Sequence, residues 1–136
     1  MVTPGYSGTP LPGKLGIKPG ARVLAVDAPK TYRALVSPLP LKAALVSTLD
    51  DRVDIIHVFV TKKADLSRFL KSALGQMRSD AALWVSWPKR AAGVPTDVTE
   101  NTIREVALPL GFVDIKVCAV DEIWSGLKLV IRKENR

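Results

Sequence analysis

Basic side chains follow three apolar stretches of the sequence, at the point where each stretch ends. These residues are Lys30, Lys62, Lys63, Lys89 and Arg90. Ammonium and guanidinium groups bind phosphate and carboxylate, lysine as a point charge and arginine through two parallel hydrogen bonds. If the stretches are parallel strands of one sheet, the cations meet at its carboxyl edge, where the ligands of such sheets bind. The pattern indicates a site for an anion, although solvated surface charges would give the same pattern.

Four further residues are expected near the same edge. Asp27 and Asp121 would add carboxylates, and Trp87 beside Pro88 would form a pocket wall. Trp124 would either cover a pocket or fold back on the core, and the sequence favours neither. All four fit packing or surface roles as well.

Catalytic chemistry has little support in the sequence. His57, the only histidine, lies on one face of an apolar stretch with Ile55 and Phe59, so we expect a neutral, hydrogen-bonded core residue. Cys118, the only cysteine, is expected to be a small buried thiol. One histidine and one cysteine cannot form a zinc site from soft ligands. The sequence predicts no catalytic residue, no metal site and no identifiable cofactor.

The composition is that of a folded chain of 136 residues, with 47% hydrophobic and 24% charged residues. The net charge of +7 is spread as +3, +3 and +1 over residues 1–30, 31–80 and 81–136. Because no basic tract concentrates it, a nucleic-acid partner is not favoured but stays an alternative. No apolar run is long enough for a membrane span, and a cytoplasmic protein is expected.

Two helices must position the candidate residues. The first is predicted over residues 62–77 with Thr61 as its N-cap, because apolar residues recur there at helical spacing. The second is predicted from Val98, with Asp97 as its N-cap and Glu100 completing a capping box.

The remaining apolar stretches predict strands. They cover residues 22–27, 53–60, 82–87, 112–120 and 127–132. Residues 41–49 fit a strand or a helix, with a strand slightly favoured. The last two strands have a short connection, so they are antiparallel neighbours. The order predicts an α/β fold: a three-layer Rossmann-like sandwich with a mostly parallel sheet and a C-terminal antiparallel hairpin.

The chain is expected to form one domain, with an extension at its start. Residues 1–20 are rich in proline and glycine but retain several apolar residues, so we predict an ordered arm that lies over the domain. Residues 21–136 would form the single Rossmann-like domain.

Several stretches resemble known families. KPGARVL at residues 18–24 resembles the lead-in to the first strand of S-adenosylmethionine-dependent methyltransferases, and residues 126–132 resemble their inserted antiparallel strand. More closely, GYSGTPLPGKLGIKPG, VSWPKRAAGVPTD and VCAVDEIWSGLKLVIR resemble a family of small bacterial proteins known only as a domain of unknown function. That resemblance covers essentially the whole chain and implies no activity.

The methyltransferase resemblance implies a glycine-rich turn after the first strand, where the backbone approaches the cofactor. Residues 27–30, DAPK, contain no glycine, and residues 30–49 are short for that half of the fold. We therefore expect an abbreviated member of the fold that does not transfer methyl groups. The leading hypothesis is a non-catalytic module that binds an anionic small molecule or a protein partner. The alternatives are a degenerate S-adenosylmethionine- or nucleotide-binding enzyme and a nucleic-acid-associated protein.

Overall fold

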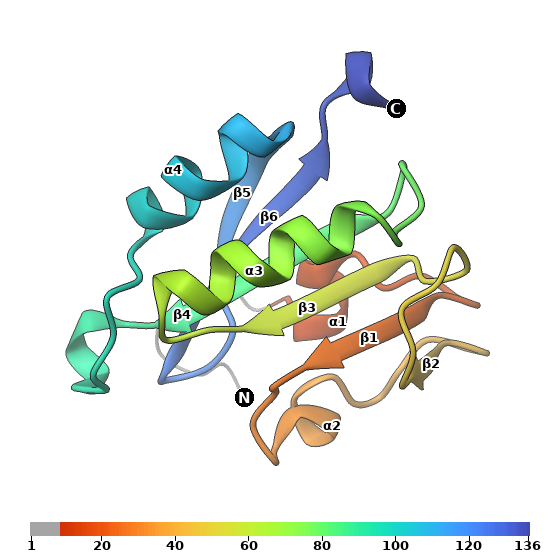
Figure 1. Cartoon of the computed structure of the whole chain (residues 1–136). Coiled ribbons are helices and arrows are strands. Elements are labelled where there is room, and N and C mark those ends of the chain that lie inside the picture. Colours follow the sequence, from red (N-terminus) through yellow and green to blue (C-terminus); the bar gives the residue numbers. More distant parts are fainter. Residues whose placement is uncertain (1–8) are drawn as a thin grey trace.

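The computed structural model describes residues 9–136, which form a six-stranded sheet between two layers of helices (Figure 1). The strand order is β2-β1-β3-β4-β6-β5. Their bounds are β1 Arg22–Val26, β2 Ala44–Val46, β3 Ile55–Phe59, β4 Ala82–Pro88, β5 Phe112–Ala119 and β6 Trp124–Ile131. β2, β1, β3 and β4 are parallel, whereas β6 runs antiparallel to β4 and to β5. The predicted fold class is confirmed.

Two amphipathic helices cover one face of the sheet. α3 (Lys63–Leu74) and α4 (Glu100–Leu110) lie in front of the strands in Figure 1. Their apolar stripes pack on a buried cluster from β3, β4 and β6. Leu66 and Leu70 of α3 and Ile103 of α4 are fully buried there.

Two short helices cover the opposite face. α1 (Leu11–Leu15) lies behind the sheet in Figure 1, and α2 (Tyr32–Leu35) follows β1. They pack on a second buried cluster that includes Phe59 and Trp84. The Trp84 indole Nε1–H donates to the Leu15 carbonyl at 3.1 Å, which fixes α1 to β4. Trp84 and Trp87 lie in different clusters, because side chains alternate between the two faces of a strand.

The predicted helix caps are wrong. α3 begins at Lys63 after Lys62, and Thr61 does not cap it with its side chain. The side chain of Asp97 instead accepts from the Lys63 N–H at 2.7 Å, so it caps α3 and not α4. α4 is capped by Thr99, which forms a capping box with Thr102. The cap prediction fails because Asp97 lies in the loop after β4, and this loop folds back onto the start of α3.

The start of β6 differs from the prediction, whereas β2 agrees with it. β6 begins at Trp124 and not at residue 127, so Trp124 lies in the strand and the turn before it is tighter than expected. Residues 41–49 contain β2, three residues long, which confirms the slight preference for a strand. β5 and β6 form the predicted antiparallel hairpin.

The parallel strands define two edges of the sheet. The carboxyl edge is where β1, β3 and β4 end, and the amino edge is where they begin.

α1 comes from the predicted arm, but residues 1–8 lie outside the described residues, and the division into an arm and a domain stays a prediction. Among the residues described, none of the helices combines the length and the apolar character needed to cross a membrane.

Candidate functional site

The predicted cations each lie beyond the carboxyl end of a parallel strand. Lys30 follows β1, Lys62 precedes α3 after β3, and Lys89 and Arg90 follow β4. Within residues 9–136, the side chains of these four residues have no hydrogen bond or ion pair. Lys63 differs, because its Nζ lies 3.7 Å from Glu105 Oε2 on α4 in an exposed ion pair. The edge therefore presents four uncompensated positive charges.

One backbone donor at the start of α3 is occupied by the protein itself. A helix N-terminus with free N–H groups is a common anion site. Here Asp97 already accepts from the Lys63 N–H. Thr96 Oγ1 donates to the Thr61 carbonyl at 2.7 Å, which holds the loop of Asp97 in place. The start of α3 thus has its own carboxylate as ligand.

Asp121 and the tryptophans serve the structure. Asp121 Oδ1 accepts from the N–H groups of Ile123 and Trp124, both at 2.8 Å, and so shapes the turn between β5 and β6. The Trp124 ring lies perpendicular to that of Phe59, with centroids 5.1 Å apart. Trp124 therefore folds back on the core, and Trp87 is half-buried against the cluster under α3 and α4. Ligand roles for these residues stay predictions.

In the turn after β1, an aspartate has a backbone conformation that glycine adopts more easily. Asp27 has φ 54°, in the left-handed region that glycine enters most easily and aspartate tolerates. The Pro29 carbonyl then accepts from the Tyr32 N–H at 2.9 Å, which starts α2. The chain makes a sharp turn here without glycine, and it directs Tyr32 inward.

Tyr32 closes a buried hydrogen-bonded group beneath the carboxyl edge. Its hydroxyl lies 2.9 Å from His57 Nδ1, and His57 Nε2 lies 2.6 Å from Ser86 Oγ. His57 and Ser86 are fully buried, and the His57 ring stacks on Phe59 at 4.4 Å. Burial lowers the pKa of His57 to about 3 and raises that of Tyr32 above its ordinary range. The predicted neutral core histidine is confirmed.

The thiol of Cys118 and possible metal ligands are two further sources of chemistry. Cys118 is half-buried, which differs from the expected full burial, and desolvation raises the pKa of its thiol despite nearby Lys14 and Lys116. Within residues 9–136, no group of three or more histidine, cysteine, aspartate or glutamate side chains is arranged to hold a metal ion.

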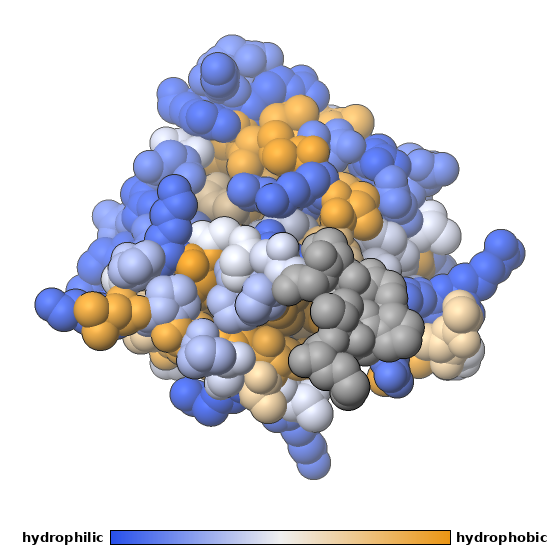
Figure 2. All heavy atoms as spheres, turned by 180° about the vertical axis from the view of Figure 1, so that it is seen from behind, coloured by the Kyte–Doolittle hydropathy of each residue, from blue (hydrophilic) through white to orange (hydrophobic). Residues whose placement is uncertain are grey.

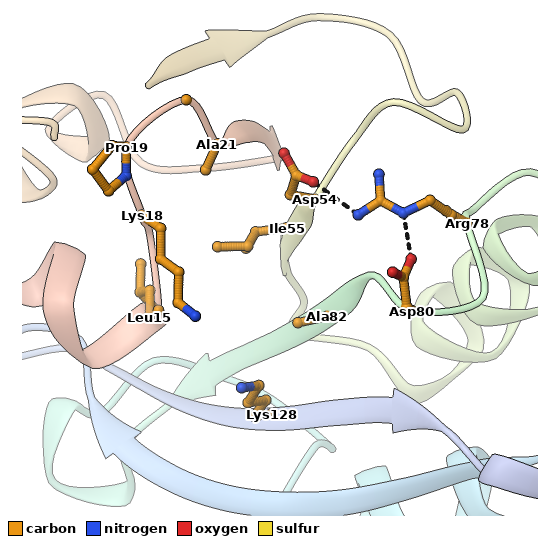
Figure 3. A pocket seen from close by; sticks show the side chains of 12 residues that line it. Leu15, Lys18, Pro19, Ala21, Asp54, Ile55, Arg78, Asp80, Ala82 and Lys128 are labelled. Carbon is orange, nitrogen blue, oxygen red and sulfur yellow. Dashed lines mark hydrogen bonds and ion pairs between the residues drawn. The ribbon is translucent and has the colours of Figure 1, made fainter. Parts of the chain in front are cut away.

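The amino edge contains a hollow that the sequence did not predict. Its volume is about 510 Å³ (Figure 3). It is lined by Leu15, Gly16, Lys18, Pro19, Gly20, Ala21, Asp54, Ile55, Arg78, Asp80, Ala82 and Lys128. Figure 3 shows Lys18 extending toward Lys128, with Arg78 between the carboxylates of Asp54 and Asp80 on the other side. The alternation of β6 places Lys128 on the α1 face, but only the fold shows that α1 leaves space beside it.

Several solved structures with a similar fold are described as methyltransferases. An S-adenosylmethionine-dependent methyltransferase from Aquifex aeolicus superposes with TM-score 0.67 at 17% identity, covering 93% of this chain and 90% of that chain. A putative type 11 methyltransferase from Sulfolobus solfataricus gives 0.63 at 14% identity, covering 90% of each. Fibrillarin from Aeropyrum pernix, with natively bound S-adenosyl-L-methionine, gives 0.52 at 15% identity, covering 93% and 70%. These likenesses establish the fold.

Sequence comparison identifies the family. No curated protein matches the chain. Residues 15–133 match the family described as protein of unknown function DUF3052. The match includes the amino-edge hollow and all nine residues predicted for the carboxyl edge. The chain belongs to the DUF3052 family of proteins of unknown function.

Proposed function

We propose that the protein is a non-catalytic binding module whose carboxyl edge binds an acidic segment of a partner protein. One observation carries the proposal: Lys30, Lys62, Lys89 and Arg90 follow three adjacent strands and have no acidic partner within residues 9–136. Unpaired like charges repel one another, and an acidic partner would relieve that repulsion.

The arrangement of donors favours an extended acidic segment over a single small anion. The Lys63 N–H at the start of α3, which could help to hold a phosphate, is bonded to Asp97. The cations are flexible side chains in the segments that follow strands spaced about 4.8 Å apart. Such a row matches several carboxylates in succession better than one compact group.

The buried chemistry supports a protein without catalysis. His57 has both ring nitrogens hydrogen-bonded and its pKa lowered to about 3 by burial, so it is a poor general base near neutral pH. The turn at residues 27–30 has no glycine to bring its backbone close to a cofactor. The methyltransferase fold of the structural neighbours does not by itself carry their activity.

Fluorescence anisotropy with a labelled poly-glutamate peptide tests the proposal. We expect binding that weakens as salt is added, because screened charges drive it. Lys89→Ala combined with Arg90→Ala should weaken binding about fivefold or more, since each exposed charge pair contributes up to about 1 kcal/mol. Arg68→Ala combined with Lys71→Ala removes the same charge from the exposed side of α3 and should change the affinity much less.

Competing ligands decide between the alternatives. Equal weakening by both double variants would show that net charge alone binds the peptide, against the proposed site. Tighter binding of a single-stranded oligonucleotide than of the peptide would favour the nucleic-acid alternative. Heat released on titration with S-adenosylmethionine, lost in the Lys89/Arg90 variant, would favour the degenerate enzyme instead.

A further inference from the structure

Hydrogen bonds from distant parts of the chain hold the walls of the amino-edge hollow. On one side, Trp84 bonds the Leu15 carbonyl and the Gly20 N–H donates to the Leu41 carbonyl at 2.9 Å. These bonds fix α1 and the turn that leads into β1. The walls of the hollow are therefore held by hydrogen bonds within the chain itself.

The opposite wall is a cluster of charged side chains that pair with one another. Arg78 Nη2 donates to Asp54 Oδ1 at 2.8 Å, and Arg78 also pairs with Asp80. The Arg22 N–H donates to Asp54 Oδ2 at 2.8 Å. Partial burial acts to raise the pKa of Asp54, but the bonds from Arg22 and Arg78 outweigh it and the pKa is lowered. This wall has two carboxylates for one guanidinium.

The wall formed by Lys18 and Lys128 carries two positive charges that have no ion pair among the described residues. Within the described part of the chain, neither Lys18 nor Lys128 has an ion pair or a side-chain hydrogen bond. Lys116 faces Lys128 across the β5–β6 pair and adds to the repulsion. Partial burial, Lys116 and Lys18 together lower the pKa of Lys128, which reflects the cost of holding these charges together.

Between these walls the lining is apolar. Leu15, Ala21, Ile55 and Ala82 supply it. The volume of about 510 Å³ falls within the range of roughly 300–1,000 Å³ that is usual for small-molecule sites. The face that carries α1 is otherwise largely hydrophilic, with its apolar residues in separate patches (Figure 2).

We propose that this hollow binds a small organic anion whose phosphate or carboxylate lies between Lys18 and Lys128. Its carbon skeleton would lie over Ile55 and Ala82. Its other end would carry hydroxyl or amino groups that donate to Asp80, whose side chain is 67% exposed. The site is independent of the proposed carboxyl-edge function, and it lies on the opposite edge of the sheet.

Isothermal titration with O-phosphoserine, glutamate, inorganic phosphate and serine tests this proposal. O-phosphoserine and serine share a skeleton and differ by the phosphate, so the proposal requires O-phosphoserine or glutamate to bind more tightly than serine. Tighter binding of O-phosphoserine and inorganic phosphate identifies phosphate as the recognised group, and tighter binding of glutamate identifies carboxylate. If no anion binds more tightly than serine, the proposal is overturned.

Matched variants locate the binding. Lys18→Gln combined with Lys128→Met should weaken anion binding about tenfold or more, because two charge-assisted contacts are lost. Arg68→Gln combined with Lys71→Gln removes the same charge from the exposed side of α3 and should leave the affinity unchanged. Equal weakening by both pairs would overturn the proposed site. Circular dichroism checks folding, and Lys18→Gln alone, on an exposed turn, gives a second measure if the double variant unfolds.

Discussion

The two edges of the sheet both carry cations that have no ion pair within residues 9–136, but the surroundings of these cations differ. At the carboxyl edge, Asp97 and Asp121 occupy backbone N–H groups, and Tyr32 fills the space beneath the strand ends. At the amino edge, hydrogen bonds fix the walls of a hollow, and Lys18 and Lys128 have no ion pair in the described part of the chain. Ligands of open parallel sheets generally bind at the carboxyl edge. We propose that in this protein a small molecule binds at the opposite edge, in the amino-edge hollow.

The His57 group beneath the carboxyl edge should produce the largest effect. The unfolded chain binds a proton at His57 near pH 6.5, whereas the folded chain binds it only near pH 3. Stability should therefore fall as the pH drops through this window, by up to about 1.4 kcal/mol per pH unit.

Urea unfolding at a series of pH values measures this dependence. His57→Gln has no titrating ring, so its unfolding free energy should vary less with pH between these limits. An unchanged pH dependence in the variant would mean that His57 is not held neutral in the folded state.

Tyr32→Phe tests whether the same group is a matched network. The change removes the hydroxyl that bonds His57 Nδ1 and leaves a buried polar atom without its partner. We expect a loss of about 1–3 kcal/mol in the free energy of unfolding, measured with urea. A loss of only a few tenths of a kcal/mol would show that the hydrogen bond contributes little to closing this edge.

Asp97→Ala should make the start of α3 more accessible to an anion, because it removes the carboxylate that accepts from the Lys63 N–H. Loss of the cap is expected to cost about 0.5–2 kcal/mol of stability. It also frees the Lys63 N–H, so inorganic phosphate should bind there better than to the unchanged protein. Thermal unfolding with and without phosphate measures both effects. Asp97→Asn retains an acceptor and should lose less stability, whereas equal losses would argue against the cap.

Lys128→Met should give the smallest effect and the opposite sign. Burial and two neighbouring lysines disfavour the charged amine in the folded state. The apolar replacement should raise the unfolding free energy by a few tenths of a kcal/mol, read from thermal unfolding. Lys71→Met, on the exposed face of α3, is the matched control. A destabilised Lys128→Met variant would show that the lysine serves the fold and not a ligand.

Much of the fold could be predicted because its signals are local. The stripe of Leu66 and Leu70 and the β-branched run of β3 specify a helix and a buried strand from neighbouring residues alone. The single histidine in that strand was assigned to the core for the same reason. Side-chain alternation along β4 likewise predicts that Trp84 and Trp87 face opposite ways, and the two residues lie in different clusters.

The parts that failed depend on contacts between distant residues. Asp97 fits an N-cap by sequence, but tertiary folding gives it to a helix that begins 34 positions earlier. Lys18 and Lys128 are 110 residues apart, and neither carries a motif. They come together because Trp84 anchors α1 beside β6, which no pattern of charge or hydropathy along the chain contains.

One measurement tests the division between the edges most directly. The ¹⁵N-labelled protein would be titrated with O-phosphoserine while its backbone amide signals are followed by NMR. We predict shifts at residues 18–21, 54, 80 and 128, and little change at residues 27–30, 61–63 and 89–90. Shifts confined to the carboxyl edge would contradict this account, because they would place the small-anion site where Asp97 is said to close it.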